Sequence, residues 1–173
     1  MTLHEGSPDV DREHACAFTG HRFIAREKLP HLERELVRYI DGMHRRLGVT
    51  RFYAGGALGF DTLAAETVLR LRDEGLPITL YLLLPCRDQD RLWSERDRRV
   101  YARILGRADS VEYLAESYSP GCMHARNRAL IDRSKYCIAF LERSSGGTAY
   151  TVDYARRSDV FVVNLGSPSG TKV

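Results

Sequence analysis

The sequence has no apolar run long enough to cross a membrane. A spanning helix needs about 20 consecutive apolar residues, and the nearly continuous apolar stretch over residues 77–84 is far shorter. The N-terminus carries Glu5, Asp9, Asp11 and Glu13 and has no apolar core. We therefore expect neither a signal peptide nor association with a membrane.

Cysteine is scarce, and none of the four cysteines forms a Cys-x-x-Cys pair. Cys16 and Cys137 lie inside strand-like runs, where a thiol usually behaves as a small buried apolar group. The spacing excludes a disulfide framework and argues against a zinc site, so we expect no metal. A reducing, cytoplasmic compartment is the simplest expectation.

Motifs for nucleophilic catalysis are also absent, because the chain has no G-x-S-x-G, no Walker loop and no metal-binding histidine pair. Its charge is nearly balanced, with 26 basic and 23 acidic residues and a net charge of +3. Such a small excess does not identify a nucleic-acid-binding protein. The arginine-rich segment 87–107 also contains acids, which favours a solvated helix with ion pairs such as Glu95 with Arg99.

Apolar runs alternate with helical patterns along the whole chain. Strands are predicted at Ala15–Phe18, Arg51–Ala54, Pro77–Leu84, Val111–Leu114, Tyr136–Leu141 and Val160–Leu165. Helices are predicted at Leu29–Leu47, Asp61–Glu74, Asp88–Arg107, Pro120–Arg133 and from the Gly146 turn to Arg157. Gly48 is placed to end the first helix, and Ser119 with Pro120 to begin the fourth.

This alternation predicts an α/β protein with one Rossmann-like, doubly wound domain. Its mainly parallel sheet should have about six strands with helices on both faces. We expect the domain to span residues 15–165, between flexible tails at residues 1–14 and 166–173. Ligands of such sheets collect at the carboxyl ends of the strands, where loops meet the N-termini of helices.

Two glycine-rich loops follow predicted strands. In the first, Gly55, Gly56 and Gly59 precede Asp61; in the second, Gly146 and Gly147 precede Thr148. Glycine lets a ligand approach the backbone closely, and a helix N-terminus offers free N–H groups to a phosphate. The alternative is that each loop only turns the chain, with Asp61 or Thr148 capping the following helix.

Cationic and aromatic residues accompany these loops. Thr19, Gly20, His21 and Arg22 follow the first strand, and Arg22 is suited to bind a phosphate or carboxylate. Arg126 and Asn127 point about 100° apart on a helix, so both can face a pocket at its start. The single tryptophan, Trp93, and the nearby Gln89 could border a base, although Trp93 could equally pack in the interior.

Together these motifs resemble the SLOG superfamily, the Rossmann-like group that contains the DprA/Smf and LOG proteins. Residues 55–61 are similar to the DprA pattern Gly-x-Ala-x-Gly-x-Asp, and residues 126–128 to its Arg-Asn-Arg. The Thr19–Arg22 segment, Pro85 with Gln89 and Trp93, and the closing Gly-Thr turn look most like the YpsA-like branch. The resemblance covers residues 15–165.

The branches imply different activities. LOG proteins are phosphoribohydrolases, and their Met-x-x-Arg element matches Met123 and Arg126, which would make Arg126 the candidate catalytic residue. Thr151 stands where their catalytic glutamate would fall, and Asp153 lies about 200° round a helix from that position. DprA proteins load recombinase onto single-stranded DNA. YpsA-like proteins have a proposed role in sensing nucleotide-derived ligands, with links to cell division and stress.

We therefore expect a sensor or regulatory domain that binds a nucleotide or nucleotide-derived ligand and requires no cofactor. LOG-like hydrolysis of a nucleoside 5′-monophosphate and DprA-like binding of single-stranded DNA are the alternatives. A homodimer is implied by the superfamily resemblance. The predicted ligand-binding residues are Thr19, Gly20, His21, Arg22, Gly55, Gly56, Gly59, Asp61, Gln89, Trp93, Arg126, Asn127, Gly146, Gly147 and Thr148.

Overall fold

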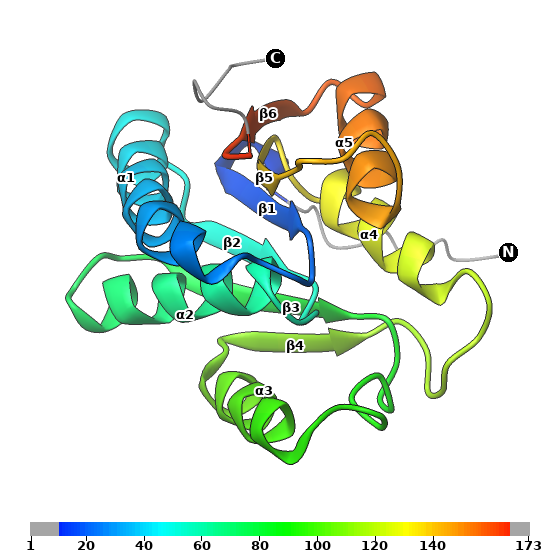
Figure 1. The fold of residues 1–173 in the computed structure, drawn as a ribbon. Coiled ribbons are helices and arrows are strands. Elements are labelled where there is room, and N and C mark those ends of the chain that lie inside the picture. Colours follow the sequence, from blue (N-terminus) through cyan, green and yellow to red (C-terminus); the bar gives the residue numbers. More distant parts are fainter. Residues whose placement is uncertain (1–10, 167–173) are drawn as a thin grey trace, which may run out of the picture.

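The computed structural model describes residues 11–166, so most of both predicted tails, at residues 1–10 and 167–173, lies outside the described residues. Six parallel strands form one sheet in the order β4-β3-β2-β1-β5-β6 (Figure 1). The strands are β1 (Ala15–Gly20), β2 (Arg51–Ala54), β3 (Thr79–Leu84), β4 (Ser110–Tyr113), β5 (Tyr136–Phe140) and β6 (Phe161–Asn164). This architecture confirms the predicted α/β fold class.

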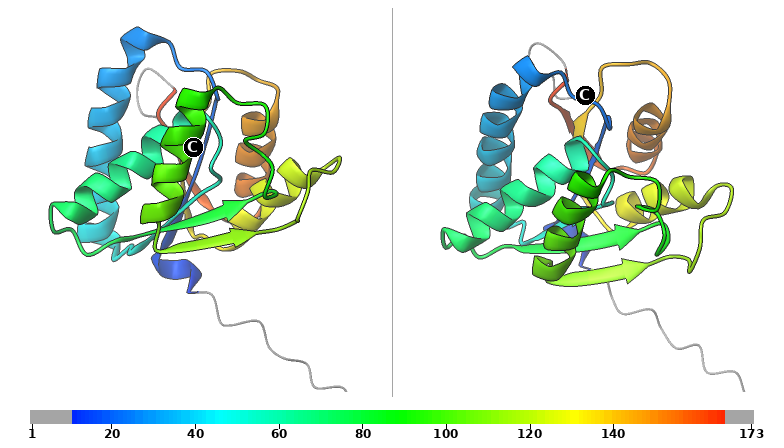
Figure 2. Two further views of the ribbon diagram at one scale, coloured as in Figure 1. Left: turned by 90° about the horizontal axis from the view of Figure 1, so that it is seen from below. Right: turned by 60° about the horizontal axis from the view of Figure 1, so that its bottom comes forward.

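Five α-helices connect these strands: α1 (Leu29–Leu47), α2 (Phe60–Asp73), α3 (Glu95–Arg107), α4 (Cys122–Asp132) and α5 (Gly147–Arg157). Helices α1, α2 and α3 lie side by side on one face of the sheet, and α4 and α5 pack together on the other (Figure 2). None of the described helices is long and apolar enough to span a bilayer.

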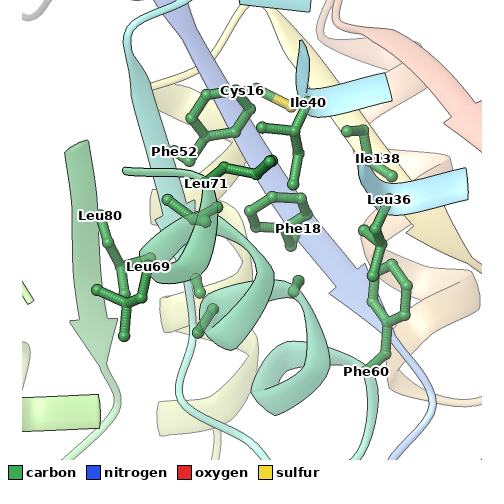
Figure 3. Packing of buried hydrophobic residues seen from close by; sticks show 14 of the residues in the cluster. Cys16, Phe18, Leu36, Ile40, Phe52, Phe60, Leu69, Leu71, Leu80 and Ile138 are labelled. Atoms are coloured by element: carbon green, nitrogen blue, oxygen red, sulfur yellow. The ribbon is translucent and has the colours of Figure 1, made fainter. Parts of the chain in front are cut away.

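Strand β1 contributes to the cores on both faces because its side chains alternate. Phe18 joins the large cluster under α1 and α2, where it stacks on Phe52 with ring centroids 5.8 Å apart (Figure 3). Ala17 belongs to the cluster under α4 and α5, together with Cys137. Cys16 and Cys137 therefore lie in different clusters, and all four cysteines are free and buried.

The order of the strands reverses at β1. From β1 the chain moves outward through β2 and β3 to β4, and α4 then carries it back to β5 on the other side of β1. Near its carboxyl end β1 pairs with β5 as far as Gly20 with Phe140, whereas its pairing with β2 stops at Ala17 with Tyr53. The loops after β1 and β5 lead to opposite faces, which creates a crevice at this switch point.

The ends of several elements follow the sequence prediction. Helix α1 has the predicted bounds and ends at Gly48, whose φ of 70° is left-handed. Strand β2 also has its predicted bounds. The segment Arg12–His14, placed in the predicted tail, instead forms a short 3-10 helix, and the N–H of Thr50 donates to the carbonyl of His14 at 3.0 Å.

Two predicted helix starts are wrong. Helix α3 begins at Glu95 rather than Asp88, and the hydroxyl of Ser94 caps it by accepting the N–H of Asp97 at 3.1 Å. The carboxylate of Asp88 accepts the N–H of Tyr118 at 3.0 Å, and such side-chain bonds to the backbone compete with a helix. Helix α4 begins at Cys122 rather than Pro120, because Gly121 is left-handed with φ of 84°.

Candidate functional site

A pocket of about 360 Å³ lies at the carboxyl ends of β1 and β5, between α4 and the starts of α2 and α5. Pockets for small ligands usually measure about 300–1,000 Å³. The predicted residues that line this pocket are Thr19, Gly20, His21, Arg22, Asp61, Arg126, Asn127, Gly146, Gly147 and Thr148. The fold thus brings together three loops that are far apart in the sequence.

His21 joins the loop after β1 to the start of α2 and to the loop after β5. Its carbonyl accepts the N–H of Phe60 at 3.1 Å, and its Nε2 accepts the N–H of Glu142 at 2.9 Å. A nitrogen that accepts a hydrogen bond carries no proton, so this bond selects the neutral imidazole. Burial, and after it the charge of Arg143, lowers the pKa of His21 below its usual value. His21 therefore holds the pocket wall as a neutral group.

Two of the predicted glycines serve close packing of the wall. A Cβ on Gly59 would lie 2.2 Å from the carbonyl oxygen of Arg22, and its φ of +77° is itself unfavourable for other residues. A Cβ on Gly20 would lie 2.5 Å from the Cβ of Phe60. These positions need glycine because Gly59 packs on the backbone of Arg22 and Gly20 packs on the side chain of Phe60.

Arg126 reaches from α4 across the sheet edge to the end of β2. Its guanidinium donates to the carbonyl of Gly55, and its Nε donates to the side chain of Asn127 at 2.7 Å. Arg126 is 4% exposed. An arginine is rarely buried to this extent unless neighbouring groups compensate its charge. A Cβ on Gly55 would lie 2.4 Å from the Nη1 of Arg126, so glycine is required there for the guanidinium to pack.

Asp61 supplies the opposing charge. It is 5% exposed, lines the pocket and accepts the N–H of Ala57 at 3.2 Å. Burial raises the pKa of its carboxyl, whereas the charges of Arg126 and Arg22 act in the opposite direction. Asp61 does not cap α2, since Gly59 occupies the N-cap position. Its carboxylate instead holds the glycine loop at Ala57, and the charge of Arg126 acts on it without a direct contact.

Five predicted residues do not line the pocket: Gly55, Gly56, Gly59, Gln89 and Trp93. Gln89 donates to the hydroxyl of Tyr101 at 2.8 Å and to the carbonyl of Gly56 at 3.4 Å. Trp93 packs edge to face on Tyr101, with ring centroids 5.2 Å apart. Gln89 therefore braces the glycine loop from the α3 side, Trp93 packs on Tyr101, and neither residue borders the cavity.

The start of α5 is open toward the pocket. No side chain caps it, and its N-cap residue Gly146 has φ of 100°. A Cβ on Gly146 or Gly147 would meet no atom within 4 Å. The first N–H groups of a helix have no partner within the helix, and they attract anions. This end of the pocket can therefore accept a phosphate group without displacing protein atoms.

Helix α5 places no carboxylate in the pocket, although LOG-like hydrolysis would require one there. Thr151 is fully buried, and its hydroxyl donates to the carbonyl of Gly147 at 2.8 Å. Asp153 forms an exposed ion pair with Arg157 at 2.9 Å. Asp61 is the acidic side chain that lines the pocket in the described part of the chain.

Several lining residues were not among the predicted ligand-binding residues: Phe18, Phe23, Ala57, Met123, Leu130 and Arg143. Two of them carried a usable signal. The signal was position alone, without a motif: Phe23 directly follows Arg22, and Arg143 stands between the end of β5 and the glycine turn. With Arg22 and Arg126, Arg143 gives the pocket three guanidinium groups against one carboxyl group.

A larger groove of about 790 Å³ lies between α1 and the starts of β5 and β6. Its walls include the apolar side chains Met43, Tyr136, Phe161 and Val163. It lacks the buried Asp61 and Arg126 and the open helix N-terminus that distinguish the smaller pocket. Recognition of a charged ligand therefore favours the smaller pocket.

The fold and pocket together define a Rossmann-like α/β protein with its candidate site at the topological switch point. A family model described as the YspA SLOG family matches residues 24–160, so the chain belongs to that family. This match confirms the predicted resemblance to the YpsA-like branch of the SLOG superfamily. The match begins at residue 24, so the pocket residues from Thr19 to Phe23 lie before it.

Curated relatives support the assignment. The SPbeta prophage-derived protein YoqJ of Bacillus subtilis is 29% identical over 139 residues, which cover 73% of this chain and 81% of YoqJ. A UPF0398 protein of Halalkalibacterium halodurans is 29% identical over 113 residues, covering 64% of this chain and 60% of that protein.

Two solved structures share the fold. DNA processing protein A of Helicobacter pylori, whose structure was described for its single-stranded DNA binding mode, superposes with a TM-score of 0.67 and 21% identity. The alignment covers 94% of this chain and 70% of that one. DprA of Streptococcus pneumoniae gives a TM-score of 0.64 and 18% identity, covering 90% of this chain and 52% of that one. At these identities the likeness concerns the fold.

Proposed function

We propose that the protein binds a nucleotide or nucleotide-derived ligand in the pocket between β1, β5, α4 and α5, as a sensor or regulatory domain. The observation that carries the proposal is that the open α5 N-terminus and the guanidinium groups of Arg22, Arg126 and Arg143 line the same pocket. Both features attract a phosphate, and a phosphate on a small organic group fits a pocket of about 360 Å³.

The arginines divide into two kinds. Arg126 is buried and already engaged with Gly55 and Asn127, so it sets the shape and potential of the pocket. Arg22 and Arg143 are exposed and form no salt bridge within residues 11–166. Their guanidinium groups are thus available to a ligand phosphate, whereas Asn127 at the pocket wall offers its amide N–H groups to ribose hydroxyls or to acceptors on the base.

Ligand-dependent thermal unfolding tests the proposal. A panel of mono-, di- and cyclic nucleotides, ADP-ribose and NAD is added to the intact protein, with EDTA present because we propose no metal or cofactor requirement. A ligand at 100 times its Kd adds about 2.7 kcal/mol of stability. For a chain of this size the unfolding midpoint should then rise by about 5–10 °C.

Matched variants locate the binding. Arg22→Ala and Arg143→Ala should each reduce the ligand-induced shift, because each removes a charged hydrogen bond worth about 1.5–3 kcal/mol. Arg38→Ala is the control, since this exposed arginine lies on α1, on the face of the sheet opposite α4 and α5. A shift that survives in both pocket variants would place the ligand elsewhere.

The same panel separates the alternatives. Release of free base from a nucleoside monophosphate would indicate hydrolase activity. A flat nucleotide panel, together with binding of single-stranded DNA that weakens steeply with salt, would indicate a nucleic-acid-binding protein. The predicted homodimer and cytoplasmic location belong to the proposal as well, and light scattering and cell fractionation test them.

A further inference from the structure

Phe23 is an aromatic residue that the fold leaves unburied at the pocket. Its side chain is 75% exposed, although it lines the same cavity as Arg22, Arg126 and Arg143. Isolated apolar residues on a surface are common and need no explanation. A large ring on the wall of a cationic pocket is different, because it borders the space that a ligand would occupy.

The backbone that carries Phe23 is held firmly. The carbonyl of His21 accepts from Phe60, the His21 ring accepts from Glu142, and the carbonyl of Arg22 is in close contact with Gly59. These contacts tie the loop to α2 on one side and to the β5 loop on the other. The backbone next to Phe23 is therefore held in place, which reduces the entropy lost when the loop binds a ligand.

The surroundings of the ring favour a small aromatic ligand over a protein surface. Its sequence neighbour Arg22 is exposed, and Arg143 lies on the facing loop. The other exposed large apolar residues of the described chain, such as Leu92 and Phe161, lie on other elements and do not line this pocket. A purine or pyrimidine provides both a face that stacks on phenylalanine and, in a nucleotide, the charge that arginine binds.

We propose that Phe23 is the base-binding residue of the pocket, so that its ligands are nucleotides with an intact aromatic base rather than sugar phosphates. This inference rests on the proposed function and names its ligand class. The phosphate lies at the α5 N-terminus and the base stacks on Phe23. Because every base has a π-face, stacking discriminates weakly between bases.

Calorimetric titration with two kinds of probe tests the inference. The probes are the nucleoside monophosphates AMP, GMP, CMP and UMP, and ribose 5-phosphate, which has the same phosphate and sugar but no base. Phe23→Leu keeps an apolar side chain and removes the ring. It should weaken nucleotide binding by about 5- to 150-fold and leave ribose 5-phosphate affinity unchanged. Phe23→Trp should retain or strengthen nucleotide binding.

Phe161→Leu is the matched control, because this phenylalanine is 44% exposed at the first residue of β6, at the opposite end of the sheet. It should bind both kinds of probe as the wild type does. Equal affinity of the wild type for ribose 5-phosphate and all nucleotides would overturn the role of Phe23 and leave the phosphate site standing. Unchanged nucleotide binding by Phe23→Leu would do the same. Failure of the wild type to bind any of these probes, together with no thermal shift across the full nucleotide panel, would overturn the proposed function itself.

Discussion

Removal of the Arg126 guanidinium should destabilise the fold as well as the pocket. In Arg126→Ala, the carbonyl of Gly55 loses its donor and the buried carboxyl of Asp61 loses its principal opposing charge. Leaving a buried polar group without its hydrogen-bond partner typically costs about 1–3 kcal/mol. For a chain of this size we expect the unfolding midpoint to fall by about 2–12 °C.

The pH dependence of this loss identifies its cause. Burial raises the pKa of Asp61 and Arg126 opposes that rise, so the variant's pKa should be higher still. A group whose folded pKa lies above its unfolded value gains stability as pH falls from the folded pKa toward the unfolded one, 3.8. The difference between wild type and Arg126→Ala should therefore shrink between neutral pH and about pH 4.

Chemical denaturation of four proteins over this pH range makes the measurement. Arg128→Ala is the matched control, because this arginine lies on the same helix but is exposed and bonds the hydroxyl of Tyr150 at 3.0 Å. The double variant Arg126→Ala with Asp61→Asn should recover part of the loss, since it removes the stranded charge. A loss below about 1 kcal/mol at neutral pH, or one independent of pH, would refute the reasoning.

Three further predictions follow from single positions. Gly147→Ala places a methyl group in open space at the α5 start, so it should weaken nucleotide binding without lowering the unfolding midpoint; wild-type affinity would argue against a phosphate there. Gly59→Ala should strongly destabilise the fold, because its new Cβ would collide with the carbonyl of Arg22. Gly106→Ala, in open space on α3, should instead stabilise the fold by about 0.5–1 kcal/mol. Unfolding in guanidinium chloride compares the two variants. Burial lowers the pKa of His21 below 6.5, so its contribution to stability is complete above pH 6.5 and is lost as pH falls through the lower folded pKa. His21→Ala should remove that part of the pH profile, and an unchanged profile would assign it to another group.

The alternation of strand and helix could be predicted because it depends on local pattern. The sequence showed the spacing of apolar residues in α1 and the end of this helix at Gly48, and it also showed the apolar segments that form β2 and β5. The predicted start of α3 was wrong for a non-local reason, and that of α4 for a local reason. Asp88 bonds a backbone N–H thirty residues away, and Gly121 adopts a left-handed conformation just before α4.

Much of the candidate site was also visible, since the loops that follow parallel strands must meet at one edge of the sheet. The sequence could not show which side chains within those loops face the cavity. Gly56 and Gln89 bond to each other behind the pocket wall, and Phe23 carried no motif to mark it. Side-chain direction in a loop is set by contacts with distant elements.

By itself, then, the sequence determined the α/β class, the parallel sheet and the edge at which a ligand would bind, because hydrophobic period and glycine placement are local properties. Only the tertiary structure decided that Arg126 is buried against Gly55, seventy-one positions away, while Arg22 and Arg143 stay exposed. The reason is physical. Burial of a charge depends on partners that other strands and helices bring to it, and those partners exist only after the sheet has formed.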